Sequence, residues 1–313
     1  MNYSASTRFS LFATFVTTLL LANPAAGGGA AGRELAAIVT AARQWWPDLS
    51  VATTTGPGEA GAIARDAAAR GVSDIIIMGG DGTIHEAANG ILSLPLEQRP
   101  HLGVVPIGTG NDFARLVGTS RKSAADALEL LADGSRRVFD VGLAWGEYFV
   151  NSLGLGLDAA VAARVPSYRH LWRPLVYPAA VMSAYFKFRP LPVEITWDSE
   201  LFAEPLYCLE VGIGVSAGGG FYLTPDAKPD DGVFDVCLVR PLNHWGFVTR
   251  MPSALWGGHV RFKEVRMLRT SRLNVAAAEP LLAHFDGETR NPGSNSIEIE
   301  LIPSALPVLA SSE

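Results

Sequence analysis

Residues Ile77 to Glu86 read Ile-Met-Gly-Gly-Asp-Gly-Thr-Ile-His-Glu, and this stretch decides the fold of the first half of the chain. The apolar run Asp74–Met78 is typical of a buried strand, and the apolar residues after the glycines recur at helical spacing. A strand that enters a helix through glycines directs backbone N–H groups towards one point, which suits a bound phosphate. Because Asp81 would repel a phosphate unless a cation lay between them, the stretch predicts a phosphate site with Mg²⁺. A plain turn in which Asp81 caps the helix is the alternative.

The same alternation of strand and helix surrounds this stretch. The predicted strands span residues 19–22, 49–55, 74–78 and 102–107, and the predicted helices span 31–46, 60–70, 123–131 and a segment from 113 onward. Such alternation predicts a parallel sheet with helices on both faces, and ligands bind beyond the carboxyl ends of its strands. A second glycine turn, Gly108–Asp112, follows the last of these strands. We therefore expect it to face the same crevice as Gly79–Thr83.

After Arg137, apolar runs of strand length replace this alternation. The runs cover residues 138–142, 148–152, 193–197, 206–215, 233–239 and 272–275, and two apolar helical inserts cover 171–186 and 244–255. They predict a mostly antiparallel, β-rich structure. A chain of 313 residues suits two domains better than one. We expect a nucleotide-binding α/β domain at 18–137 and a β-rich domain at 138–313, whose last residues are candidates for packing back on the first domain.

Residues 1–17 admit three interpretations: a signal peptide, a disordered start and a misassigned start codon. The apolar run from Leu11 to Ala22 resembles a signal sequence with a cleavage region near Ala26. We favour a strand at Leu19–Ala22 instead, because cleavage there would remove an element that the sheet needs.

Composition excludes several classes of protein. The formal charge of −6, without a compensating basic block, argues against a nucleic-acid binder. The only cysteines, Cys208 and Cys237, lie far apart in strand-like runs, so buried free thiols in a reducing compartment are expected. Beyond the N-terminal run, no segment has the 18 or more uninterrupted apolar residues of a membrane span.

Three glycine-containing loops of the second half carry polar residues. Asn151–Asp158 is typical of a tight turn or bulge after a strand. The aspartates of 225–232 suit either a solvated turn or a hard-cation site, and His284–Glu288 suits either a hairpin tip or a catalytic site. The helical inserts with Trp172 and Trp245 suit either packing or membrane contact.

Together these segments resemble the diacylglycerol kinase catalytic-domain family, which includes bacterial lipid kinases and sphingosine kinases. The likeness runs in order from Leu19 to the C-terminus and rests on Asn23-Pro24 with its glycines, Gly79–Thr83, Pro106–Ala114, Phe149–Asn151 with Gly154, Gly156 and Asp158, Asp231–Asp235, and Asp286–Glu288. The first glycine-aspartate turn is shared with NAD kinases and phosphofructokinases. The segment Gly-Thr-Gly-Asn-Asp-Phe-Ala-Arg is more specific to lipid kinases. The resemblance implies an α/β domain of the NAD kinase and diacylglycerol kinase type, an antiparallel β-rich C-terminal domain, and an active site between them.

The resemblance also implies ATP and Mg²⁺ as cofactors and assigns the site residues. The nucleotide-binding residues would be Asn23, Thr54, Gly79, Gly80, Asp81, Gly82, Thr83, Ile84, His85, Glu86, Gly108, Thr109, Asn111 and Asp112. Asp81 would lie near the Mg²⁺ of the nucleotide, and a structural Mg²⁺ would be held by Asp231 and the carbonyls of Lys228 and Val233. The catalytic residues would be Asp286 and Glu288, and we favour Glu288 as the proton acceptor.

The function implied is transfer of the γ-phosphate of ATP to the hydroxyl of diacylglycerol or a related lipid alcohol. The protein would be cytoplasmic and peripheral at the inner membrane surface, without nucleic acid, and a homodimer is possible within this pattern. A kinase of a soluble acceptor, such as an NAD-like metabolite, and a non-catalytic nucleotide-binding regulator are the alternatives.

Two positions depart from the family pattern. His85 stands where Asn is common, and Ala30 and Ala31 stand where the first glycine turn often carries Lys. Arg33 or Arg115 would then compensate the charge of the phosphates.

Overall fold

The computed structural model describes residues 17–120, 123–168 and 173–311, so the expectations for residues 1–16 and for Trp172 lie outside the described residues. The first half contains a parallel sheet in the order β2-β1-β3-β4. Its strands are β1 (Thr18–Ala22), β2 (Ser50–Thr53), β3 (Asp74–Gly79) and β4 (His101–Pro106). The expected parallel sheet is confirmed.

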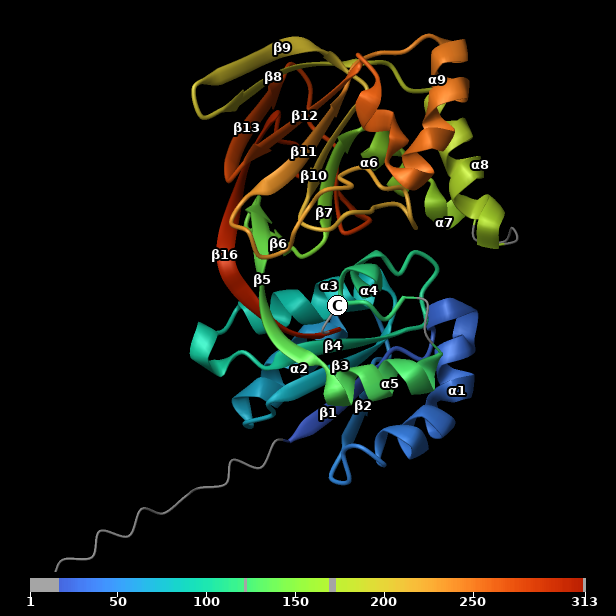
Figure 1. Cartoon of the computed structure of the whole chain (residues 1–313), viewed down its shortest axis with the longest axis vertical. Coiled ribbons are helices and arrows are strands. Elements are labelled where there is room, and N and C mark those ends of the chain that lie inside the picture. Colours follow the sequence, from blue (N-terminus) through green and yellow to red (C-terminus); the bar gives the residue numbers. More distant parts are fainter. Residues whose placement is uncertain (1–16, 121–122, 169–172, 312–313) are drawn as a thin grey trace, which may run out of the picture.

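Helices cover both faces of this sheet (Figure 1). They are α1 (Ala26–Ala42) and α5 (Ala124–Asp133) on one face, and α2 (Glu59–Ala69) and α3 (Asp81–Leu92) on the other, with the short α4 (Asp112–Leu116) after β4. The two-residue period of a strand explains the division. Leu19 and Leu21 pack in the core with α2 and α3, whereas Leu20 packs in the core with α1 and α5.

The second half adds two layers of antiparallel strands. One layer extends the first sheet through β16 (Ser296–Ala310), β13 (Arg272–Ala277), β8 (Leu191–Trp197) and β9 (Glu200–Leu206), with β5 (Ser135–Ala144) and β6 (Glu147–Phe149) paired beside them. The other layer contains β12 (Val265–Thr270), β11 (Phe234–Val239), β10 (Cys208–Gly212), β7 (Ser152–Gly156), β14 (Ala283–Phe285) and β15 (Glu288–Arg290). Phe149, Phe234 and Phe285 lie in the apolar core between these layers.

Helices of the second half gather on one side of the strands, at the right of Figure 1. They are α6 (Leu157–Ala162), α7 (Val165–Tyr168), α8 (Arg173–Tyr185) and α9 (His244–Arg250), followed by the 3₁₀ turns Met251–Trp256 and Gly258–Arg261. A further 3₁₀ turn spans Leu96–Gln98 in the first half. The fold class expected from the sequence, an α/β unit followed by an antiparallel β-rich unit, is confirmed.

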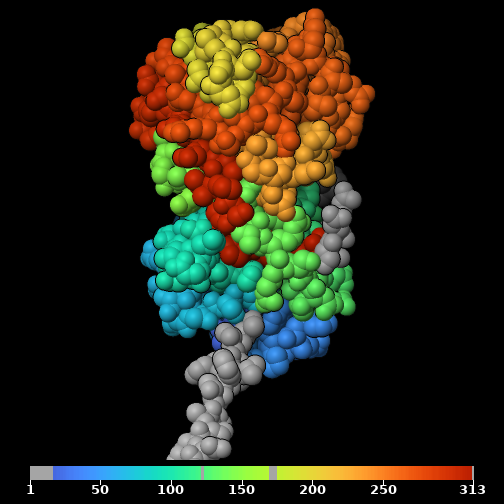
Figure 2. Space-filling model, turned by 60° about the vertical axis from the view of Figure 1, so that its left-hand side comes forward, coloured from blue at the N-terminus to red at the C-terminus, as the bar shows by residue number. Residues whose placement is uncertain are grey.

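The long strand β16 joins the two halves. It pairs with β5 and β13 in the second half and ends beside β4, where Val308 faces Leu102 in parallel register. Figure 2 shows the same C-terminal strand, in red, descending from the upper half onto the lower half. The parallel sheet is therefore completed by residues from the far end of the chain.

Some elements differ from the sequence expectations. The segment around Gly154 is not a turn but the strand β7, in the interior of its sheet. Helix α1 ends at Ala42 rather than Trp46, and it begins with three glycines in left-handed conformation, Gly27, Gly28 and Gly29. The run 206–215 is divided at Tyr207 into β9 and β10.

Within the described residues, none of the helices combines the length and apolar character needed to cross a membrane. Cys208 and Cys237 are both free thiols, as expected, but only Cys237 is buried and Cys208 is half-buried.

Candidate active site

The glycine turns after β3 and β4 meet at the carboxyl edge of the parallel sheet. A Cβ on Gly108 would lie 2.7 Å from the Cα of Gly80, so the two turns touch through their backbones. The glycine turn after β1, at Gly27–Gly29, lies beside them, because a Cβ on Gly27 would lie 2.5 Å from the carbonyl oxygen of Ile107. Three glycine turns thus converge where a parallel sheet binds its ligands.

Asp81 opens α3 at this meeting point. Its Oδ1 accepts the N–H of Phe113 at 3.3 Å, and its Oδ2 lies 2.7 Å from where a Cβ on Gly110 would be. Burial and the negative charge of Asp112 raise the pKa of Asp81 to about 7. A carboxylate so placed is stabilised by a cation, and oxygen ligands are those that Mg²⁺ prefers. The residues present therefore fit a nucleotide-bound Mg²⁺ at Asp81.

Asn23 and Thr54 fix the surroundings of the glycine turns. The side-chain amide of Asn23 donates to the hydroxyl of Thr83 at 3.0 Å, which ties the first turn to α3. The N–H of Thr54 donates to the carbonyl of Ala22, and the residue is buried at the end of β2. Both residues therefore lie at the carboxyl ends of neighbouring strands, β1 and β2.

The side chains of Glu86 and His85 have other partners. The Glu86 carboxylate accepts the N–H groups of Gly58 at 2.8 Å and Ala60 at 3.3 Å, so it caps the start of α2. His85 is buried and faces the second half of the chain. Both side chains thus already have partners within the protein.

Asp112 connects the two halves. Its carboxylate accepts from Arg115, from the hydroxyl of Ser216 at 3.0 Å and from the N–H of Gly219 at 2.7 Å. Asn111 before it adopts a left-handed conformation with φ of 54°. The second glycine turn is thereby anchored to the loop that follows β10.

Of the two candidate bases, Asp286 is the one whose carboxylate is held by hydrogen bonds. Its carboxylate accepts the N–H groups of Val150, Asn151 and Ser152 at 2.8–3.2 Å and a ring nitrogen of His85 at 2.8 Å. The residue is buried and has a left-handed φ of 51°. Asp286 therefore fixes the β14–β15 turn against the β6–β7 connection.

Glu288, two residues further on, is exposed and faces the glycine turn of the first half. Its Oε1 lies 2.7 Å from where a Cβ on Gly82 would be. Among the described residues, no hydrogen-bond partner of its carboxylate is found. Of the two acids, Glu288 is the one available to an incoming molecule.

The residues expected to hold a structural Mg²⁺ lie elsewhere, in the loop before β11. The Asp231 carboxylate is bound by Arg269 and by the N–H of Val233, and Lys228 is exposed nearby. Asp235 keeps one buried oxygen without a hydrogen-bond partner, with Arg269 at 3.5 Å. Arg269 of β12 thus pairs with both acids, Asp231 and Asp235.

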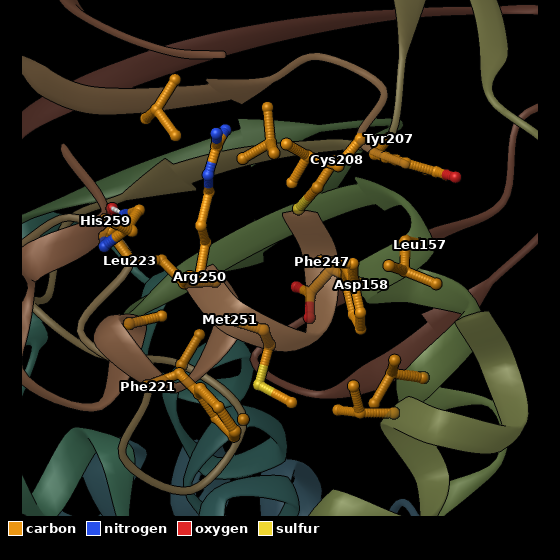
Figure 3. Close-up of a pocket in the computed structure, with 18 of the residues that line it drawn as sticks. Leu157, Asp158, Tyr207, Cys208, Phe221, Leu223, Phe247, Arg250, Met251 and His259 are labelled. Carbon is orange, nitrogen blue, oxygen red and sulfur yellow. Dashed lines mark hydrogen bonds between the residues drawn. The ribbon is translucent and has the colours of Figure 1, made fainter. Parts of the chain in front are cut away.

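The second half contains an apolar pocket that was not predicted from the sequence (Figure 3). Its walls come from α6, α8, α9, the Met251–Trp256 turn and the loop that follows β10, and include Leu157, Val161, Tyr177, Val181, Gly218, Phe221, Phe247, Met251 and Ala254. Asp158 of α6 is one of its few charged residues, and its carboxylate is bonded to His284. The aromatic residues of the inserts suited either packing or membrane contact, and neither interpretation predicted a pocket.

A polar cluster of Asp158, Glu210 and His284 was also not predicted from the sequence; their ligand-type atoms lie within 4.8 Å of one another. Burial and the charge of Asp158 raise the pKa of Glu210 to about 8. His284 Nδ1 accepts the N–H of Gly287 at 3.3 Å, which leaves Nε2 to donate to Asp158. Both carboxylate oxygens of Glu210 are buried without a hydrogen-bond partner among the described residues. The sequence signal for this cluster was Glu210, an acidic residue within the apolar strand β10.

Comparison with known proteins agrees with this geometry. The model of the diacylglycerol kinase catalytic domain matches residues 17–144, and that of the YegS C-terminal NAD kinase beta sandwich-like domain matches residues 151–310. A diacylglycerol kinase of Bacillus subtilis is 35% identical over 77% of this chain and 79% of its own length. A diacylglycerol kinase of Staphylococcus epidermidis is 30% identical over 68% of this chain and 67% of its own.

A crystal structure of a diacylglycerol kinase from Bacillus anthracis has the same fold, with a TM-score of 0.74 and 24% identity over 95% of this chain and 97% of its own. The matched regions contain the converging glycine turns, Asp81 and the Asp286–Glu288 turn. The chain therefore belongs to the diacylglycerol kinase catalytic-domain family and is a lipid kinase.

Proposed function

We propose that the protein transfers the γ-phosphate of ATP to the free hydroxyl of diacylglycerol or a closely related lipid alcohol. The position of Tyr177 carries this proposal. Its ring forms part of the apolar pocket wall, and its hydroxyl oxygen lies 3.5 Å from where a Cβ on Gly110 would be, beside Asp81. An acyl chain in the pocket would thus end next to the phosphate turns.

The phosphates of ATP would lie over the glycine turns, where absent side chains leave backbone N–H groups accessible. Asp81 would hold Mg²⁺, which neutralises the charge that develops on the phosphates during transfer. Arg115 is already bound to Asp112 and to the carbonyl of Gly110 at 3.1 Å, so it supports the turn rather than the phosphates.

Glu288 would accept the proton of the lipid hydroxyl. A general base must reach the proton that it removes, and Glu288 is exposed beside Gly82 while Asp286 already accepts several hydrogen bonds. The role of Asp286 would be to hold the turn that presents Glu288. Such a base contributes about a hundredfold to ten-thousandfold in rate.

The lipid would be taken from a membrane surface. Large apolar side chains are exposed around the pocket. The aromatic ones, Phe186, Trp245 and Trp256, are called the aromatic rim, and Val248 and Leu255 are exposed near them. Trp245 and Trp256 are 81% and 66% exposed, and aromatic side chains on a short helix favour the lipid–water interface. The neighbouring Arg261 and Lys263 would add attraction to anionic lipids.

A phosphorylation screen tests the proposal. The protein, radiolabelled ATP and Mg²⁺ would be incubated with vesicles containing diacylglycerol, a sphingoid base, phosphatidylglycerol or an isoprenoid alcohol, and in parallel with soluble metabolites including NAD. We expect label in the diacylglycerol vesicles. Label in NAD alone would establish the soluble acceptor instead, and nucleotide binding without label in any acceptor would establish a regulator.

A further inference from the structure

His85 lies between two carboxylates that come from the second half of the chain. Its Nδ1 is 2.8 Å from Oδ2 of Asp286, and its Nε2 is 2.7 Å from Oε1 of Glu147. The side chain of His85 is only 3% exposed, so water does not replace either partner. This histidine joins helix α3, which begins with Asp81 and Gly82, to the β14–β15 turn and to β6.

The two contacts fix the protonation state of the ring. An ionised carboxylate only accepts hydrogen bonds, so each ring nitrogen must carry a proton, and the side chain is an imidazolium. Burial alone would lower the pKa of His85, but the hydrogen bonds with Asp286 and Glu147 raise it to about 9. Burial likewise opposes ionisation of Glu147, yet its bonds with His85 and Arg290 lower its pKa to about 2.

The contacts continue from Glu147 back to the strand that carries Glu288. Arg290 donates to Glu147 through Nε at 2.8 Å and through a terminal nitrogen at 2.6 Å, a two-pronged pairing that fixes direction as well as distance. Arg290 ends β15, and Glu288 begins it. The segment from Asp286 to Arg290 is therefore held at both ends. Asp286 contacts His85 directly, and Arg290 is linked to His85 through Glu147.

We propose that His85 is a positioning residue for phosphoryl transfer, which as a doubly donating imidazolium sets the carboxylate of Glu288 over Gly82. His85, which holds the hairpin, and Gly82, which faces Glu288, are one turn apart on the same helix, α3. Movement of the hairpin relative to that helix would change the distance from Glu288 to the phosphates. The inference rests on the proposed role of Glu288 as base.

The charged groups around His85 come from each neighbouring element. Asp286 faces it from the β14–β15 turn and Glu147 from β6, with Arg290 of β15 behind Glu147. On its own helix Asp81 lies one turn before it, and Asp81 is close enough to Asp286 for their charges to interact. The carboxylates of Asp286 and Glu147 contact the ring directly, so they affect the charge of His85 more than Arg290 and Asp81 do.

Two substitutions separate this role from a general contribution to folding. Glu147→Gln keeps the shape and an accepting oxygen but removes one charge, and His85→Asn keeps one donor towards Asp286 but cannot reach Glu147. We expect each variant to fold and to lose about tenfold to hundredfold in kcat, with the KM for ATP nearly unchanged, because misplacement of a catalytic group affects the transfer step. His101→Asn is the matched control, since His101 at the start of β4 pairs with Asp74 at the start of β3, away from the turn.

Nitrogen-15 NMR of the histidine rings gives a readout independent of turnover. In the wild-type protein at neutral pH, His85 should show two protonated nitrogens, and in Glu147→Gln it should titrate at a lower pH. The upper pH limit of activity in that variant should fall with it. A single unprotonated nitrogen on wild-type His85 at neutral pH, or folded variants with the wild-type kcat, would overturn the proposal. Undiminished turnover by Glu288→Gln would instead refute the base assignment and leave the His85 spectra unaffected.

Discussion

Glu288 and Gly82 are in contact across the junction of the two halves: a Cβ on Gly82 would lie 2.7 Å from Oε1 of Glu288. Gly82 belongs to the first turn of α3 and Glu288 to the start of β15, so residues more than half the chain apart form one surface. The missing side chain at position 82 leaves the space that this carboxylate borders. This contact is where a phosphate on α3 and an alcohol near Glu288 would meet.

Glu288→Gln and Asp286→Asn should affect different properties. We expect Glu288→Gln to lower kcat by about a hundredfold to ten-thousandfold with an unchanged melting temperature, because an exposed base is lost without a structural contact. Asp286→Asn should destabilise the protein by about 1–3 kcal/mol, since an amide group would face the N–H groups that now donate to the carboxylate. Kinetics and thermal unfolding of both variants would check this. Normal turnover by Glu288→Gln combined with a stable, inactive Asp286→Asn would exchange the two roles.

Alanine substitutions at Gly82 and Gly108 should have different effects, because one Cβ would meet a side chain and the other would meet backbone. At Gly82 a Cβ meets only the flexible end of Glu288, so Gly82→Ala should fold and lose activity by moving the base. At Gly108 a Cβ meets the backbone of Gly80, so Gly108→Ala should spread the phosphate turns and raise the KM for ATP. Gly56→Ala is the control, because no atom lies within 4 Å of its Cβ position. Equal behaviour of all three variants would contradict the convergence of these turns.

Asp81→Asn should stabilise the nucleotide-free protein while abolishing its activity. Burial and Asp112 raise the pKa of Asp81 to about 7, above the usual value of about 3.9 in an unfolded chain. A raised carboxyl pKa means that the wild-type protein loses stability as the pH rises towards the folded value, and Asn escapes this loss. We expect the melting temperature of the variant to exceed that of the wild type at about pH 8 but not at about pH 4. Addition of Mg²⁺ and ATP should stabilise the wild type alone, and stabilisation of both proteins by these ligands would count against Asp81 as the Mg²⁺ residue.

Val181→Phe should narrow the apolar pocket and reduce selection of long acyl chains. Val181 lines the pocket and is almost completely buried, so a larger ring has to enter the hollow. We expect a higher KM for long-chain diacylglycerol, a smaller effect with short chains, and an unchanged KM for ATP. Val51→Phe, at an exposed position of β2 in the first half, is the matched control. An unaltered chain-length preference would show that the acyl chains bind elsewhere.

Removal of the aromatic rim should weaken membrane binding without loss of the fold. Replacement of both Trp245 and Trp256 by Ala removes two exposed side chains that make little contact within the protein. We expect less protein to sediment with anionic vesicles and a lower rate on vesicles, but an unchanged rate on a detergent-dispersed lipid. Trp45→Ala, an exposed tryptophan of the first half, is the control. Sedimentation equal to that of the wild type would exclude this surface as the contact.

Local sequence signals located the glycine turns correctly and failed on the segment after Phe149. Strand period, helical spacing and glycine position are encoded within about ten residues, so β3, the turn at Gly80 and α3 could be predicted directly. The glycines at 154 and 156 were interpreted as a turn, but the segment forms β7. Its neighbours explain the difference, because β10 and β14 pair on either side of it and a Cβ on Gly154 would collide with Asp158 and His284.

By itself the sequence determined the fold class, the family resemblance, and the candidate turns and acids, because these depend on residue types and short-range spacing. Only the tertiary structure decided how the acids differ: Asp286 is enclosed by backbone N–H groups and by His85, while Glu288 is left open beside Gly82. It also decided the partners of His85, the completion of the parallel sheet by β16, and the apolar pocket. The physical reason is that these features depend on contacts between distant segments, such as His85 and Asp286, which are 201 positions apart, and no local pattern encodes such a contact.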